Sequence, residues 1–284
     1  MSERNLSTVA VVTDSTADIP KETQEELQIS VVPALVMLNG DSYLDGIELS
    51  RSEFYSRLPE FSTPPSTAAP SMQTFEDTYE RLLSKGFEKV VSIHLPSTLS
   101  AILDVATQAA ISFGDRVHPF DSGQVSLGMG FQVIESALEA IKGASLHDVM
   151  DVAKRTRENV RLIALIDSLE YLKRSGRVGW LSAGLGDFLH IKILLELSDG
   201  EVNRLGQVRT RSRAKTQLRE IAETWGALDR LAVAHSAVPE EAEDLATNIA
   251  DFCPTPPLVI EVTTAIGAHI GPGALGIIGL KQAS

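Results

Sequence analysis

Short apolar runs alternate with amphipathic stretches along the first half of the chain. Residues 9–13, 89–95 and 117–120 have the length and the β-branched content of buried strands. Between them, apolar side chains recur over residues 72–83 with a period of about 3.6, which predicts a helix that Ser71 caps and Gly86 ends. Strands and helices that alternate in this way favour right-handed crossovers and a largely parallel sheet.

The same alternation continues in the second half. Residues 192–197 and 202–208 flank Asp199-Gly200, a strong turn signal between two strands. Further strands are expected at 161–166, 230–235, 258–263 and 274–280, and helices at 146–159, 178–189, 212–225 and 239–252. Because no long linker occurs, we expect an α/β protein of two domains, residues 1–158 and 159–284, packed closely around a ligand-binding cleft.

Two segments follow neither period. Residues 62–70 are rich in Pro, Ser and Thr and are predicted to form a loop, in which Thr67 can serve as a binding group. Residues 267–273 hold three glycines and Pro272 around His269, a composition typical of a tight turn. A histidine in such a turn can donate a hydrogen bond to an anion, or it can be incidental.

Composition narrows the classes of function. The 284 residues contain no apolar run of about 18 residues, so no membrane span is expected. The net charge of −13 argues against nucleic acid as a partner and against an anionic membrane as a resting place, and it leaves transient membrane contact open. A single cysteine, Cys253, excludes a disulfide framework and fits a reducing cytoplasm. The six histidines are scattered, so neither a metal nor a cofactor is predicted.

Small polar residues gather where the predicted strand 89–95 ends. Ser97, Thr98 and Ser100 follow it directly, and Ser100 lies where a helix is expected to begin. Free backbone N–H groups and the helix dipole favour an anion at such a place. The other interpretation is that Ser97 or Ser100 only caps its own helix.

A serine hydrolase acting on acyl esters is the alternative function. Ser100 or Ser97 is then the nucleophile and His269 the base, with Asp14 or Asp121 as the aspartate that the histidine requires. No Gly-x-Ser-x-Gly nucleophile elbow occurs, which weakens this hypothesis. The phosphate-binding loop and the dinucleotide fingerprint are missing as well.

Positive charge gathers in two places of this acidic chain. Lys173, Arg174 and Arg177 form one cluster, and residues 204–215, which include Arg209, form the other. Arginine is favoured at docking surfaces for partners. The alternative is that both clusters are ordinary solvated side chains that balance the charge of nearby acidic residues.

Six segments, in order and spread over nearly the whole chain, resemble motifs of the DegV family, the bacterial fatty-acid-binding proteins that include the FakB subunits of fatty acid kinase. They are Thr13-Asp14-Ser15 through Asp18, Thr67-Ala68-Ala69-Pro70-Ser71, residues 95–101, Phe120-Asp121-Ser122, residues 169–178 and residues 267–273. The chain departs from the family pattern at Ala69, Pro96, Ala101, Ser175 and Ile270. These departures can alter head-group geometry or the preferred acyl chain.

The resemblance implies a two-domain α/β carrier for one long-chain fatty acid, without a cofactor. It implies that Thr67, Ser100 and His269 bind the carboxylate, with Ser97 and Thr98 of the same segment as further candidates. The acyl tail is expected in the N-terminal domain. About 16 to 18 carbons, at about 0.8 kcal/mol for each buried CH₂, supply more gross free energy than tight binding requires.

The resemblance also implies a protein partner. A separate fatty acid kinase phosphorylates the bound carboxylate, and the acyl phosphate feeds phospholipid synthesis. The carrier itself is not expected to be an enzyme. Arg177 and Arg209 are the positions that best match the family's kinase-contacting arginines.

Overall fold

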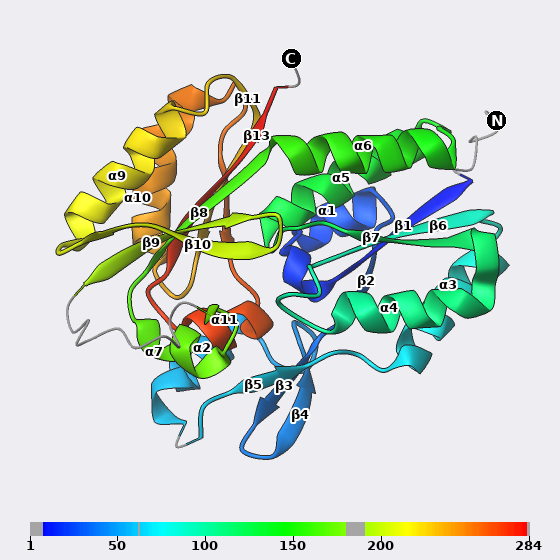
Figure 1. The fold of residues 1–284 in the computed structure, drawn as a ribbon, viewed down its shortest axis with the longest axis horizontal. Coiled ribbons are helices and arrows are strands. Elements are labelled where there is room, and N and C mark those ends of the chain that lie inside the picture. The colour runs from blue at the N-terminus through cyan, green and yellow to red at the C-terminus, as the bar shows by residue number, and fades with distance from the viewer. Residues whose placement is uncertain (1–7, 62, 180–190, 283–284) are drawn as a thin grey trace.

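A four-stranded sheet forms the centre of the N-terminal half of the structure, a computed structural model that describes residues 8–61, 63–179 and 191–282 (Figure 1). All its pairings are parallel, in the order β2-β1-β6-β7, which confirms the predicted parallel sheet. The strands are β1 (Val9–Asp14), β2 (Ser30–Val32), β6 (Lys89–His94) and β7 (Val117–Asp121).

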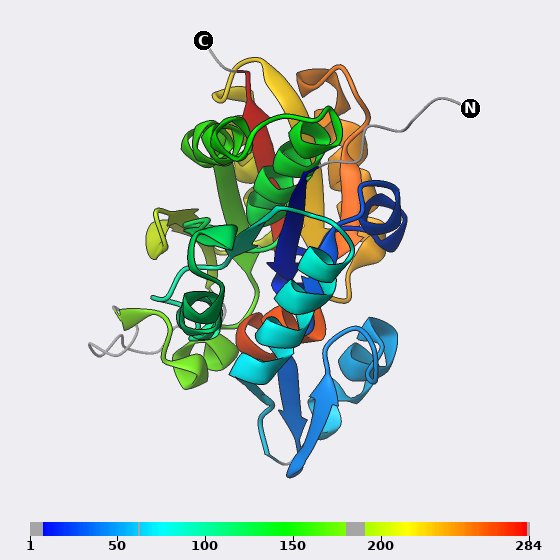
Figure 2. The same cartoon turned by 90° about the vertical axis from the view of Figure 1, so that its right-hand side faces the viewer.

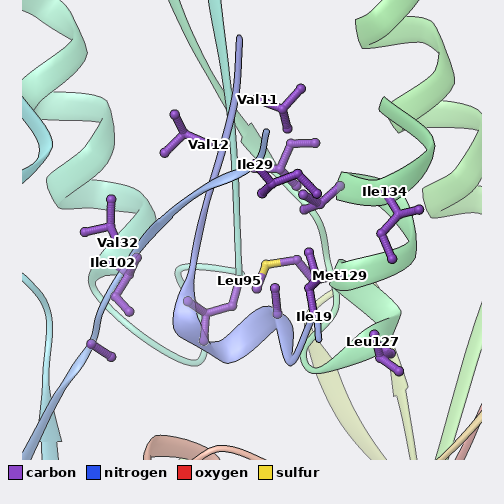
Figure 3. Close-up of a cluster of buried hydrophobic side chains, with 14 of the residues drawn as sticks. Val11, Val12, Ile19, Ile29, Val32, Leu95, Ile102, Leu127, Met129 and Ile134 are labelled. Atoms are coloured by element: carbon purple, nitrogen blue, oxygen red, sulfur yellow. The ribbon is translucent and has the colours of Figure 1, made fainter. Parts of the chain in front are cut away.

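Helices cover both faces of this sheet because its strands are apolar on both sides. Figure 3 shows Val12 on the side of Ile102 and Val11 on the side of Ile134, as the alternation of a strand requires. The helices are α1 (Lys21–Glu26), α3 (Met72–Ser84), α4 (Ile102–Ala110), α5 (Leu127–Ile141) and α6 (Leu146–Asn159). Short 3₁₀ turns span Ser15–Ala17, Leu58–Glu60, Ile111–Arg116 and Ala250–Phe252.

A small antiparallel sheet projects from the rest of the molecule (Figure 2). Its order is β4-β3-β5, and its elements are β3 (Leu35–Leu38), β4 (Asp41–Leu44), β5 (Ser66–Ala68) and the adjoining α2 (Arg51–Arg57). The prediction of a loop over residues 62–70 is therefore wrong in its middle. Thr67 lies on a strand because the backbone of β5 pairs with β3, where Thr67 is opposite Val36.

A six-stranded mixed sheet forms the C-terminal half, in the order β10-β9-β8-β13-β11-β12. The strands are β8 (Val160–Ile166), β9 (Lys192–Ser198), β10 (Glu201–Val208), β11 (Leu228–His235), β12 (Leu258–Glu261) and β13 (Leu275–Lys281). Helices α9 (Arg211–Glu223) and α10 (Pro239–Ile249) cover its outer face through Ile163, Leu165 and Ile277. The inner face contacts α5 and looks toward α11 (Thr264–Ile270) (Figure 1).

Two predicted elements differ from the structure, and a third lies largely outside its described residues. The tight turn expected at residues 267–273 is wrong at its start: His269 lies in the last turn of α11, and left-handed backbone appears only at Gly271 and Gly273, with φ of 71° and 84°. Helix α4 begins at Ile102, so Ser100 precedes it by two residues. The helix predicted at 178–189 falls largely outside the described residues. These stop at residue 179, shortly after α7 (Leu169–Ser175), and resume at residue 191.

Candidate functional site

A cavity of about 160 Å³ lies between the N-terminal elements and the inner face of the six-stranded sheet. Aliphatic side chains from both halves of the chain make up most of its wall. They include Leu95, Leu99 and Ile102 from the first half, and Leu162, Ala164, Ile166, Leu195, Leu197, Ile266 and Ile270 from the second. The cavity is therefore built for a largely apolar ligand.

Polar side chains also form part of this wall. Thr67, Ser100 and His269 all line the cavity, as the sequence predicted that they would share a site. Thr67 Oγ1 and His269 Nε2 are 2.8 Å apart, although the two residues are 202 positions apart in the chain. Ser100 Oγ accepts only a long bond of 3.4 Å from the backbone N–H of Ile102, so its hydroxyl proton can be donated into the cavity.

His269 is neutral in this setting. Burial, and to a smaller extent the nearby positive charge of Arg177, lower the pKa of its imidazole to about 4. A neutral ring carries one N–H donor. With two hydroxyls and the guanidinium of Arg177, which also lines the cavity, the site offers several donors to one anion. A carboxylate removed from water needs two or three such donors.

The helix that carries His269 is held at its start by a carboxylate from the first domain. Asp45 Oδ1 accepts hydrogen bonds from the Thr264 hydroxyl (2.5 Å) and from the Ala265 N–H (3.3 Å). Asp45 Oδ2 accepts one from the Ser15 hydroxyl at 2.6 Å. Asp45 is 2% exposed, so these bonds are shielded from water, and they orient α11 toward β5.

A second buried carboxylate, Asp18, supports the same helix one residue earlier. Its Oδ1 accepts from the Thr263 N–H at 2.8 Å and pairs with Arg51 at 3.3 Å, and its Oδ2 accepts from the Ser126 hydroxyl at 2.6 Å. Burial raises the pKa of Asp18 to about 7, against the opposing influence of Arg51 and these hydrogen bonds. Sequence reasoning missed both aspartates because no local pattern links them to residues more than 200 positions away.

The other predicted site residues lie elsewhere or have partners of their own. Ser97 is exposed and donates to Asp104 at 2.7 Å. Thr98 donates to the carbonyl of Gly200 at 2.6 Å, and neither residue lines the cavity. Arg209 is exposed on the second domain. Arg177, expected only at a partner surface, also lines the cavity and is exposed to solvent, with Nε 3.4 Å from the carbonyl of Leu99.

A Ser–His–Asp array does occur, but away from the cavity. His94 Nδ1 is 2.9 Å from Asp14 Oδ2, and His94 Nε2 is 2.7 Å from Ser92 Oγ. All three side chains are 0% exposed, so no ester can reach them. Within the described residues His269 bonds to Thr67 and to no carboxylate, so it lacks the acid that the hydrolase alternative requires.

The described residues contain neither a candidate metal site nor a candidate membrane span. They contain no group of three or more His, Cys, Asp or Glu placed to hold a metal ion. No helix among residues 8–61, 63–179 and 191–282 combines the length and the apolar character of a membrane span.

Known proteins match this chain over almost its whole length. The family model described as "Uncharacterised protein, DegV family" matches residues 8–282. A DegV domain-containing protein of Streptomyces coelicolor is 35% identical over 95% of this chain and 97% of its own. A solved structure described as fatty acid binding of a DegV family protein from Thermus thermophilus has a TM-score of 0.90, with 29% identity over 96% of this chain and 99% of that one. DegV of Bacillus subtilis, described as a fatty acid binding protein, has a TM-score of 0.84 with 32% identity, over 96% and 99% of the two chains.

Proposed function

The chain belongs to the DegV family, and we propose that it binds a long-chain fatty acid in the cavity between an N-terminal domain, residues 1–158, and a C-terminal domain, residues 159–284. The aliphatic wall and the cluster of donors at one part of it support this ligand. The descriptions of the Thermus and Bacillus structures support it as well. Because β8 and β9 contribute much of the wall, we propose that the tail lies between the domains, and not in the N-terminal domain alone.

One observation carries the proposal: Thr67 and His269 are hydrogen-bonded to each other on the wall that Ser100 also lines. In the proposed complex the Ser100 hydroxyl donates to the carboxylate, the Thr67 hydroxyl and the imidazole N–H exchange the bond between them for bonds to the carboxylate, and Arg177 balances its charge. The 2.8 Å contact holds both donors in place before the ligand arrives, which lowers the ordering cost of binding.

We further propose that the protein presents this carboxylate to a separate fatty acid kinase in the cytoplasm. A carboxylate oxygen forms a bond to the γ-phosphorus of ATP as the bond to ADP breaks, and the acyl phosphate product feeds phospholipid synthesis. The protein contributes binding and not catalysis, which fits a histidine without a carboxylate partner in the described structure. The exposed side chains of Arg177 and Arg209 are the proposed kinase contacts.

The ligand is tested by native mass spectrometry of protein purified from a bacterial host. We expect an added mass equal to one fatty acid with a long chain, which organic extraction and gas chromatography then identify. Protein that carries no lipid, and that takes up no radiolabelled palmitate after delipidation, contradicts the proposal.

The head-group assignment is tested by Thr67→Val and Ser100→Ala. Each variant removes a donor to a charged group, so we expect palmitate affinity to weaken by about 1–3 kcal/mol, measured by calorimetry on delipidated protein. Ser97→Ala is the matched control, because this neighbouring hydroxyl bonds to Asp104 outside the cavity. Unchanged affinity in both test variants removes the two residues from the site.

The kinase step is tested by incubating loaded protein with ATP and the catalytic subunit of a bacterial fatty acid kinase. We expect ADP release and an acyl phosphate that hydroxylamine traps as the hydroxamate. Arg209→Glu is expected to slow turnover without changing palmitate affinity, whereas Arg219→Glu, whose Nε contacts the carbonyl of Asn248, serves as control. No turnover with any bacterial kinase subunit contradicts this part of the proposal and leaves fatty acid binding standing.

A further inference from the structure

The cavity continues beyond the part that holds the polar groups. A second cavity of about 90 Å³ adjoins it on the same inner face of the six-stranded sheet. The two share wall residues on β8 and α11, namely Leu162, Ala164, Ile166, Ile266 and Ile270. The first cavity extends toward β9 and β10, and the second toward β13 and β11, so together they cross the middle of the sheet.

The strand register explains why space is left there. Ala164 on β8 is opposite Leu195 on β9 and Gly276 on β13, and Gly276 is opposite Ala234 on β11. Three small residues on adjacent strands therefore lie in one row, and all three line the second cavity. The row on one side is bulkier on three of these strands, where Leu162 on β8 is opposite Leu197 on β9 and Ile278 on β13. A furrow runs across the strands as a result.

The length of the furrow suits a hydrocarbon chain. Leu195 and Ala234 lie three strand spacings apart, or about 14 Å at about 4.8 Å for each spacing. An extended chain of C–C bonds of about 1.5 Å advances about 1.25 Å per carbon, so the furrow takes about eleven carbons. The remaining carbons of a long acid reach from β9 to the donors at Thr67, Ser100 and His269.

Two polar side chains lie at the far end. Ser126 donates its hydroxyl proton to Asp18 at 2.6 Å. His235 is 6% exposed, and its Nδ1 accepts a bond of 3.4 Å from the N–H of Val238. Burial lowers the pKa of His235, which disfavours a positive charge on this wall. Apolar residues make up the rest of this wall, which suits a methyl terminus.

We propose that this furrow selects the length of the bound acid: the distal part of the chain crosses β8, β13 and β11, and the small side chains of Ala164, Gly276 and Ala234 admit it. The proposal rests on the proposed function and names the substrate class within it, saturated or gently bent acids as long as palmitate and stearate. Ala164 is the decisive position because it has the smallest side chain among the wall residues that the two cavities share.

The test narrows the furrow with larger side chains at two places, the junction of the two cavities and the far end. Ala164→Ile places a branched side chain between the two cavities, and β-branched residues suit a strand. Ala234→Val narrows only the far end. Ala232→Val is the matched control, because Ala232 lies two residues away on β11, is 0% exposed, and lines neither cavity. Delipidated proteins are titrated with decanoate, laurate, myristate, palmitate and stearate, and circular dichroism verifies their folding.

For the wild type we expect affinity to rise with length up to palmitate or stearate. Ala164→Ile is expected to lower the ratio of palmitate to laurate affinity by about tenfold or more, since several methylenes lose their buried site. Ala234→Val is expected to lower the stearate to myristate ratio by a smaller factor, and Ala232→Val to leave both ratios unchanged. A wild type that binds none of the acids overturns the proposed function. Ratios that stay unchanged in a folded Ala164→Ile or Ala234→Val protein overturn the furrow alone.

Discussion

Two histidines of this protein bond to hydroxyl groups in opposite surroundings. His94 is 0% exposed inside the four-stranded sheet, where one ring nitrogen meets Asp14 and the other meets Ser92. His269 lines the cavity, where its Nε2 meets Thr67 and Arg177 lies nearby. Both ring nitrogens of His94 are used by the protein, whereas the described structure gives His269 one hydrogen-bond partner.

The difference separates a structural histidine from the proposed binding histidine. Since an ionised carboxylate only accepts, His94 donates to Asp14 and accepts from Ser92, which in turn is 2.9 Å from the Tyr79 hydroxyl. The chain of bonds joins β1, β6 and α3 and is complete. His269 has no such anion, so an anionic ligand can take that place. A hydrogen-bonded Ser–His–Asp geometry by itself therefore does not identify a reactive site.

The largest expected effect comes from His94→Ala. The change removes the donor to the buried Asp14 Oδ2 and the acceptor of the Ser92 hydroxyl proton, so we expect a loss of about 3–5 kcal/mol in the free energy of unfolding, measured by urea denaturation. His118→Ala, on the neighbouring β7, is the control and is expected to change stability by about 0.5 kcal/mol or less. Equal losses in the two variants contradict a structural role for the His94 network.

The next effect concerns pH. Between pH 6.5 and about 4 the unfolded chain protonates the residue-269 imidazole while the folded, ligand-free protein does not, because burial lowers its pKa to about 4. The free energy of unfolding therefore falls as pH drops through this window, by about 3 kcal/mol. His269→Gln removes this contribution, so its stability relative to the wild type should rise toward low pH.

Asp18 makes an opposite contribution to the pH dependence of stability, and the comparison with His269→Gln cancels it. The pKa of Asp18 is raised to about 7, so the folded protein binds that proton before the unfolded chain does, and Asp18 stabilises the fold as pH drops. Both proteins carry Asp18, and only the difference between their thermal unfolding curves is interpreted. Parallel pH profiles for the two proteins contradict a buried neutral His269.

The smallest effect tests how His269 is held. Asp45→Asn keeps the shape of the side chain but loses the carboxylate that accepts from Thr264, Ala265 and Ser15. We expect palmitate affinity to weaken by about 1 kcal/mol, because α11 no longer holds His269 against Thr67. Asp41→Asn, an exposed change on β4, should leave calorimetric affinity untouched. If Asp45→Asn binds like the wild type, α11 is positioned without this carboxylate.

Local patterns were enough for much of the fold. Helix α3 begins where the sequence placed its cap, with Ser71 accepting the backbone N–H of Thr74. The hairpin of β9 and β10 turns at Asp199-Gly200, both in left-handed backbone, as the dipeptide predicted. In these cases the signal and the structure it encodes lie within a few residues of each other.

The errors fall where distant segments decide the backbone. Residues 66–68 form a strand only because β3 offers an edge to pair with. The glycine-rich stretch around His269 becomes a helix because Asp45 accepts from its first turn. The three polar residues of the proposed head-group site were predicted as a set, but Arg177 at the cavity and the two aspartates that hold α11 have no signature in the sequence near His269.

The position of β13 has a consequence for how the protein is made. This strand fills the place between β8 and β11, yet it follows both along the chain. Until Leu275–Lys281 has left the ribosome, β8 and β11 each expose an unpaired apolar edge, and pairing at such sequence separation is slow. The wall of the second cavity, to which Gly276 and Ile278 belong, is therefore complete only after this last strand has joined the sheet.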